Sequence, residues 1–204
     1  VKGLLALGAS PNAEYFSLEE EAVHSMLYLA ISSQELTLVQ ALVEVGANVN
    51  ENVRHSSSLR PMHLLAQTQH IPILQYLVQK GIDVNQRNYL QETALMKLRM
   101  SSQAVEFAKT LIAAGADVNA RDRYGNTALV IILSPSLMGG NAQVRLQVFE
   151  ALIRGGADLN TGKHFANQSF ADMSTLAYAV SVENLETVKM FVEAGARAWP
   201  EESL

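Results

Sequence analysis

The stretch that decides the fold is Leu111-Ile112-Ala113-Ala114-Gly115-Ala116-Asp117-Val118-Asn119, near the middle of the chain. Its paired apolar residues are typical of a helix end, and the glycine supplies the left-handed backbone that closes a helix at low cost. The Asp-Val-Asn that follows is short and polar around one β-branched residue. This composition is typical of a tight turn whose asparagine side chain bonds nearby backbone groups. The stretch therefore predicts a helix end followed by a turn or hairpin.

The same sequence motif recurs along the chain. Its marker glycines step by 38, 35, 34, 41 and 39 residues, and they are Gly8, Gly46, Gly81, Gly115, Gly156 and Gly195. Asparagine stands four residues beyond the glycine in five of the six copies, at Asn12, Asn50, Asn85, Asn119 and Asn160. Self-similarity at such a period predicts a repeat architecture.

Two apolar-periodic stretches precede each full marker, which predicts two short helices per unit with a turn between them. We expect negligible strand content. The expected helices lie near Ser25–Ser32, Leu36–Val45, Met62–Gln67, Ile71–Gln79, Ala94–Met100, Val105–Ala113, Thr127–Leu133, Gln143–Arg154, Thr175–Ser181 and Leu185–Glu193.

One unit resembles a known family. Asp122-Arg123-Tyr124-Gly125-Asn126-Thr127-Ala128-Leu129 resembles the opening of an ankyrin repeat, in which Asp, two variable residues, Gly and one variable residue precede Thr-Pro-Leu-His. Pro61–Ala66 is similar to the Pro-Leu-His part, and Gln69–Leu74 and Glu183–Val188 are similar to the start of the second helix. The resemblance covers essentially the whole chain at a period near the roughly 33 residues of ankyrin repeats. It implies an all-α fold, an ankyrin-repeat solenoid of antiparallel helix pairs with hairpin-like fingers.

We expect a single ankyrin-repeat domain over residues 1–204, with five full repeats preceded by a partial one. The expected units are about 1–12 (partial), 13–50, 51–85, 86–119, 120–160 and 161–204. Val1–Leu7 corresponds to a second helix without its first helix, and a repeat does not bury its apolar face alone. We therefore expect the chain to be a fragment of a longer protein.

Composition narrows the function. The net charge is −5, with 15 Lys and Arg against 20 Asp and Glu, so no global positive field exists to attract nucleic acid. The apolar runs are far shorter than the roughly 20 residues that span a bilayer, so we expect no membrane insertion. The chain has no cysteine, which fits a reducing compartment. We expect a cytoplasmic location, or the host cytosol for a secreted effector.

The sequence lacks recognisable catalytic patterns. Its five histidines never show the helical i, i+4 pairing of a zinc site, and no nucleophile has a recognisable base partner. Structural roles are expected for His63, which the resemblance assigns to bracing neighbouring loops, and for His70 at the start of a helix. We therefore expect no enzyme activity, no catalytic, cofactor-binding or metal-ligating residues, no cofactor and no small-molecule substrate.

Protein binding remains as the expected function. Stacked repeats curve and place finger tips and first helices along one concave surface, where partners of ankyrin repeats usually lie. Aromatic residues and arginine most often dominate binding energy. We place the centre of the contact at Tyr89, Arg123 and Tyr124, which puts aromatics at equivalent tips of neighbouring units. The candidate partner-binding residues are Tyr89, Leu90, Glu92, Arg123, Tyr124, Asn126, Arg54 and His55.

The expected function is a non-catalytic scaffold that binds another protein through this concave finger and inner-helix surface. The alternative is a substrate-targeting ankyrin module of a larger enzyme or secreted effector, whose catalytic domain precedes residue 1. An enzyme in its own right is a third hypothesis. The long fingers Asn12–Ser25 and Asn160–Ser174 are either further contact loops or drift in tolerant surface loops.

Overall fold

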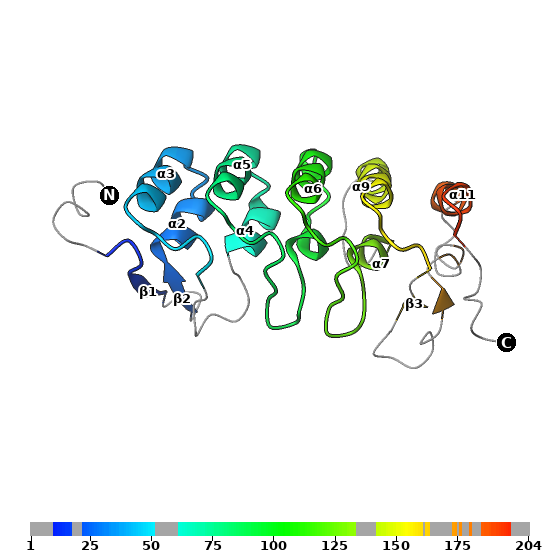
Figure 1. The fold of residues 1–204 in the computed structure, drawn as a ribbon, viewed down its shortest axis with the longest axis horizontal. Coiled ribbons are helices and arrows are strands. Elements are labelled where there is room, and N and C mark those ends of the chain that lie inside the picture. The colour runs from blue at the N-terminus through cyan, green and yellow to red at the C-terminus, as the bar shows by residue number, and fades with distance from the viewer. Residues whose placement is uncertain are drawn as a thin grey trace. The chain divides into compact units, whose positions relative to one another are not determined.

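The computed structural model describes residues 10–17, 22–51, 61–133, 142–160, 162–163, 173–174, 176, 180 and 185–196. The chain divides into two compact units, Val1–Leu98 and Arg99–Leu204. Each unit is built from short helices that include antiparallel pairs (Figure 1).

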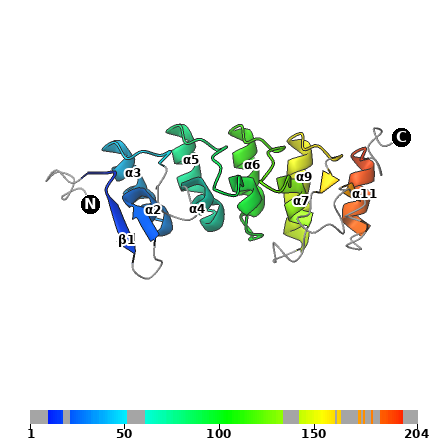
Figure 2. The ribbon, with the colours of Figure 1, turned by 90° about the horizontal axis from the view of Figure 1, so that it is seen from below.

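The first unit contains two helix pairs and a short helical turn. The first pair is α2 (Met26–Ser32) and α3 (Leu36–Glu44), and the second is α4 (Pro61–Thr68) and α5 (Ile71–Gln79). The 3₁₀ helix η1 (Ala94–Lys97) follows. Figures 1 and 2 show α2 beside α4 and α3 beside α5, so like helices stack on like.

The second unit contains α6 (Ala104–Ala113), α7 (Ala128–Leu133), α9 (Ala142–Arg154) and α11 (Leu185–Glu193). Its core is aromatic where the last two helices meet, because the rings of Phe149 and Phe191 lie edge to face with centroids 4.8 Å apart. Both phenylalanines are buried, as are Phe107 and Leu111 of α6. Aromatic pairs at this distance and angle are favourable beyond the area they bury.

Local signals explain where the helices begin and end. The hydroxyl of Ser25 accepts a hydrogen bond from the Tyr28 N–H at 2.9 Å, which caps α2. His70 Nδ1 accepts from the Ile73 N–H at 3.3 Å and caps α5. The marker glycines that follow α3, α5, α6, α9 and α11 all have positive φ, between 81° and 95°. A left-handed residue at this place ends a helix, so the recurring motif acts as predicted.

Eight of the ten predicted helices agree with the structure to within one residue at each end. The helix predicted near Thr175–Ser181 lies mostly outside the described residues. The helix predicted over Ala94–Met100 is wrong in type and length, because η1 ends at Lys97 and Leu98 is extended, with φ −61° and ψ 129°. Leu98 and Met100 are both buried while Arg99 between them is exposed. That alternation suits an extended chain, since a helix would turn the two apolar side chains away from each other.

The long fingers contain short antiparallel strand pairs, which the expectation of negligible strand content omitted. In the first finger β1 (Glu14–Ser17) pairs with β2 (Ala22–Ser25) in the register Glu14↔Ser25. In the last finger β3 (Gly162–Lys163) pairs with β4 (Met173–Ser174). Both fingers have enough extra residues to fold back on themselves, so the lengthened fingers form hairpins.

Candidate functional site

Finger 86–92 in the first unit carries three of the predicted contact residues. The side chain of Asn88 orders it, because Asn88 Oδ1 accepts from the N–H groups of Leu90 and Glu92, both at 2.9 Å. The Asn88 N–H donates to the Glu92 carbonyl at 3.1 Å and closes the loop. Tyr89 lies at the tip with 63% of its surface exposed. Tyr89 is therefore presented to solvent by a loop with a fixed backbone.

The other two predicted residues of this finger are less available. Leu90 is partly buried. Glu92 accepts a hydrogen bond from Asn88 Nδ2 at 2.6 Å and pairs with Lys97 Nζ at 3.4 Å. The Glu92 carboxylate is thus engaged inside the finger, which leaves Tyr89 as the residue best placed to contact a partner.

Finger 120–126 in the second unit has the same construction around Asp122. Asp122 Oδ1 accepts from the N–H groups of Tyr124 and Asn126, both at 2.8 Å. Asn126 Nδ2 donates to the other carboxylate oxygen of Asp122 at 3.1 Å. The predicted contact residue Asn126 therefore holds the loop, and its side chain is turned toward the finger itself.

Arg123 and Tyr124 form the outer surface of finger 120–126. Arg123 is exposed, 45% of the Tyr124 surface is exposed, and the guanidinium of Arg123 lies 5.5 Å from the centroid of the Tyr124 ring. Arg121 is also exposed on this finger, while the Asp122 carboxylate accepts hydrogen bonds within the turn. The finger consequently presents cationic and aromatic groups.

The two fingers correct one detail of the prediction. Asn88 and Asp122 hold the same place in their loops, so Tyr89 corresponds to Arg123 and Leu90 corresponds to Tyr124. The aromatic tips are therefore offset by one position and are not equivalent. Arg54 and His55, the remaining predicted contact residues, lie outside the described residues.

The recurring asparagines join neighbouring repeats. Asn119 Nδ2 donates to the Gly156 carbonyl at 3.0 Å, and Asn119 Oδ1 accepts from the Asp158 N–H at 2.7 Å. Asn50 makes the same two bonds to Gly81 and Asp83. The sequence predicted bonds to nearby backbone groups, but these partners lie 31 to 39 residues away. Asn119 and Asn50 thus each fix the base of one finger to the helix end of the next repeat.

The two histidines that were assigned structural roles have them. His63 is fully buried, and its Nε2–H donates to the Glu92 carbonyl at 2.8 Å, since a carbonyl oxygen can only accept. His63 therefore braces the base of finger 86–92 from helix α4. His70 caps α5, as described above.

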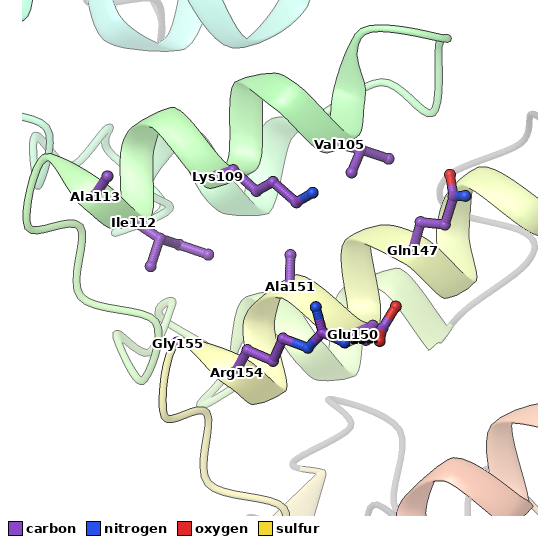
Figure 3. Close-up of a pocket in the computed structure, with 9 residues that line it drawn as sticks. All are labelled: Val105, Lys109, Ile112, Ala113, Gln147, Glu150, Ala151, Arg154 and Gly155. Atoms are coloured by element: carbon purple, nitrogen blue, oxygen red, sulfur yellow. Dashed lines mark hydrogen bonds and ion pairs between the residues drawn. The ribbon is translucent and has the colours of Figure 1, made fainter.

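The structure also shows features that the sequence did not single out. A hollow of about 390 Å³ lies between α6 and α9, and its only sequence signals are small residues near two helix ends (Figure 3). In the first unit the hydroxyl of Ser25 donates to Glu51 Oε1. Burial raises the pKa of the Glu51 carboxyl above its ordinary value of 4.5, the Ser25 hydrogen bond partly offsets this, and the charge of Glu14 adds to the rise.

Within the described part of the chain, no three His, Asp or Glu side chains lie together as a group that could hold a metal ion. No helix in that part is long and apolar enough to cross a membrane.

Comparison with known proteins supports the repeat fold. Residues 1–88 match the model of the ankyrin repeats family, described as three copies. A 59-residue stretch, 29% of the chain, is 36% identical to alpha-latrocrustotoxin-Lt1a of Latrodectus tredecimguttatus. The chain spans about 4% of the length of that toxin. The family match and the helix pairs together show an all-α ankyrin-repeat fold, and ankyrin repeats are in general protein–protein interaction modules.

Proposed function

We propose that the chain is a non-catalytic scaffold that binds another protein through its fingers and the first helices beside them. The observation that carries the proposal is the exposure of Tyr89, Arg123 and Tyr124 on fingers whose backbones are fixed by internal hydrogen bonds. Tyrosine and arginine are frequent binding hot spots, and a loop that is ordered before binding loses less entropy when a partner arrives.

The proposal includes a single array of five full repeats and a partial one over residues 1–204, which extends beyond the matched residues 1–88. Two features beyond residue 88 support it: the left-handed glycines Gly115, Gly156 and Gly195 after helices, and the Asn119 bonds to the next repeat. The partner proposed is another protein, with no nucleic acid, membrane insertion, cofactor or small-molecule substrate. The lack of cysteine supports a cytoplasmic site of action.

Affinity capture from extracts of the source organism tests the scaffold function. The tagged chain is compared with a tip variant, Tyr89→Ala with Tyr124→Ala, and a control variant, Val45→Ala with Val192→Ala. Both variants remove two exposed side chains, but Val45 and Val192 lie at the ends of second helices. Quantitative mass spectrometry should find proteins that the parent and the control capture and the tip variant loses. Identical capture by all three would contradict the proposal.

The alternative is a targeting module of a larger enzyme or secreted effector, active in the host cytosol. The match to a small part of a much longer toxin favours it. Sequencing the complete transcript discriminates the two, because this alternative requires a catalytic domain encoded upstream of residue 1.

A further inference from the structure

Helices α6 and α9 lie on the side of the second unit away from finger 120–126 (Figure 1). A hollow lies between these two helices (Figure 3). Val105, Lys109 and Ile112 line it from α6, and Gln147, Ala151 and Arg154 line it from α9. Its volume, about 390 Å³, is at the lower end of the range for ligand pockets. It can therefore accept a few side chains of a partner segment but not a folded domain.

The hollow exists because three residues are small where a neighbouring repeat has large ones. Counted back from the marker glycines, Ala113, Ala151 and Gly155 occupy the positions that Gln79, Tyr76 and Lys80 occupy in and after α5. A Cβ atom on Gly155 would lie 3.0 Å from Ile112 Cγ2, closer than side chains normally approach. Glycine at this position lets the end of α9 approach α6 and leaves an apolar floor.

Charged groups surround this floor on both sides. Arg154 pairs with Glu150 at 2.5 Å along α9. Lys109 is exposed on α6, and none of the carboxylates that the structure describes lies within ion-pair distance of its ammonium group. The rim thus carries two cations and one carboxylate, in a chain whose net charge is −5. The local charge complements an acidic group on the α6 side.

We propose that the hollow between α6 and α9 binds a short segment of a partner protein in which an acidic residue adjoins aliphatic residues. The aliphatic side chains cover Val105, Ile112 and Ala151, and the carboxylate pairs with Lys109. Glu150 on the opposite wall disfavours a segment with a second negative charge there (Figure 3). This site is separate from the fingers. A negative result at the hollow would therefore not contradict the scaffold function proposed for the fingers, and a negative result at the fingers would not contradict this site.

Methyl-detected NMR titration of the full chain tests the site. The probes are three blocked tripeptides with leucine at both ends and glutamate, glutamine or lysine in the centre. We expect the methyl signals of Val105, Ile112 and Ala151 to shift. We expect the glutamate peptide to bind about 1.4- to fivefold more tightly than the glutamine peptide, the range for one exposed ion pair. The lysine peptide should bind most weakly.

Two lysine variants isolate the role of charge. Lys189 stands six residues before Gly195, as Lys109 stands six residues before Gly115, and both are exposed. Lys109→Glu should make the lysine peptide bind more tightly than the glutamate peptide, whereas Lys189→Glu should leave the parent order unchanged. A parent order that survives Lys109→Glu, or a reversal by Lys189→Glu, would overturn the assignment of Lys109.

A third variant tests the floor. Ala113 is exposed, and the equivalent position of the preceding repeat carries the larger Gln79, which is also exposed. Ala113→Leu should fill part of the hollow and weaken all three peptides, while Tyr124→Ala should leave their binding unchanged. The site would be rejected by groove methyl signals that stay fixed at millimolar peptide, or by equal binding to the parent and Ala113→Leu.

Discussion

Asn119 contributes to stability through two bonds that cross from one repeat to the next. In Asn119→Ala the Asp158 N–H and the Gly156 carbonyl lose their partner, and each lost hydrogen bond at a site open to water costs about 0.5–1.5 kcal/mol. We therefore expect the free energy of unfolding to fall by about 1–3 kcal/mol, measured by urea denaturation. Gln75→Ala, an exposed change on helix α5, serves as the control and should shift stability by no more than about 0.5 kcal/mol. Equal stability of both variants would show that these bonds contribute little.

Glu51 makes the stability of the fold depend on pH. Its pKa is raised in the folded state by burial, so the folded state holds the proton more strongly than the unfolded state does. The stability that depends on this proton is present at pH values below the unfolded pKa, about 4.5, and is lost as the pH rises through the folded pKa. Glu51→Gln keeps an acceptor for Ser25 and removes the charge. The variant should therefore match the parent at low pH and become the more stable of the two as the pH rises toward 7.

Thermal melting at several pH values measures this difference. Glu35→Gln removes an exposed carboxylate from the same unit and is the control variant, measured at the same pH values. A Glu51→Gln difference that stays constant or shrinks as the pH rises would mean that burial does not dominate at Glu51.

For individual residues, the sequence predicted structural roles better than hydrogen-bond partners. The regular return of asparagine indicated a structural role, and the turn was predicted correctly at the five marker glycines that the structure describes. Asn50 bonds to Gly81 and Asp83, however, because stacking brings the next repeat over it. The spacing of residues within one repeat carries no information on that contact.

The helices follow from local chemistry wherever apolar residues have helical spacing and a left-handed glycine ends the helix. Helix α5 was predicted to the residue, since His70 caps it and Gly81 closes it. The segment Ala94–Met100 was predicted wrongly as one helix, because burial of both Leu98 and Met100 required an extended backbone after Lys97. Helix propensity is a weak prior that tertiary packing overrides.

In the fingers too, local hydrogen bonds could be predicted from the sequence, whereas contacts made by the folded chain could not. Asn88 and Asp122 belong to the residue types whose side chains accept from backbone groups two and four residues ahead, so the finger turns could be predicted. The engagement of Glu92 by Asn88 and Lys97 could not, because it depends on how the finger folds back. Of the predicted contact residues that the structure describes, the ones left most exposed are Tyr89, Arg123 and Tyr124.

Leu111 tests the buried face of helix α6. Its side chain is fully buried, so Leu111→Asp places a carboxylate among apolar groups and removes the contacts of leucine. We expect a loss of about 3–5 kcal/mol, or failure to fold, by chemical denaturation followed by circular dichroism. Ala113→Asp, on the exposed side of the same helix, introduces the same charge near a helix C-terminus and should cost no more than about 1 kcal/mol. Similar losses in the two variants would contradict the assigned orientation of α6.

The predicted contact residues are distributed over both compact units, with Tyr89 in the first and Arg123 and Tyr124 in the second. A partner that binds through all three residues therefore contacts one finger in each unit. Removal of one anchor should weaken binding by about 1–3 kcal/mol, which is roughly 5- to 150-fold in Kd. The fold should persist in each case, because tip side chains contribute little to the core.

Calorimetry with an identified partner decides how many units participate. We expect Tyr89→Ala and Tyr124→Ala, which lie on two different fingers, each to weaken binding. We expect the two losses to add within about 0.5 kcal/mol in the double variant, as independent contacts do. An effect of only one substitution would confine the interface to that unit.

Arg123→Ala should weaken binding as well if the guanidinium contacts a carboxylate of the partner. Its effect should not add fully to that of Tyr124→Ala, because the two side chains lie against each other. Melting curves of all variants, with Val45→Ala as a control away from the fingers, separate loss of contact from loss of fold. Unchanged affinity in every tip variant would move the interface to the long fingers or to the connection before α9.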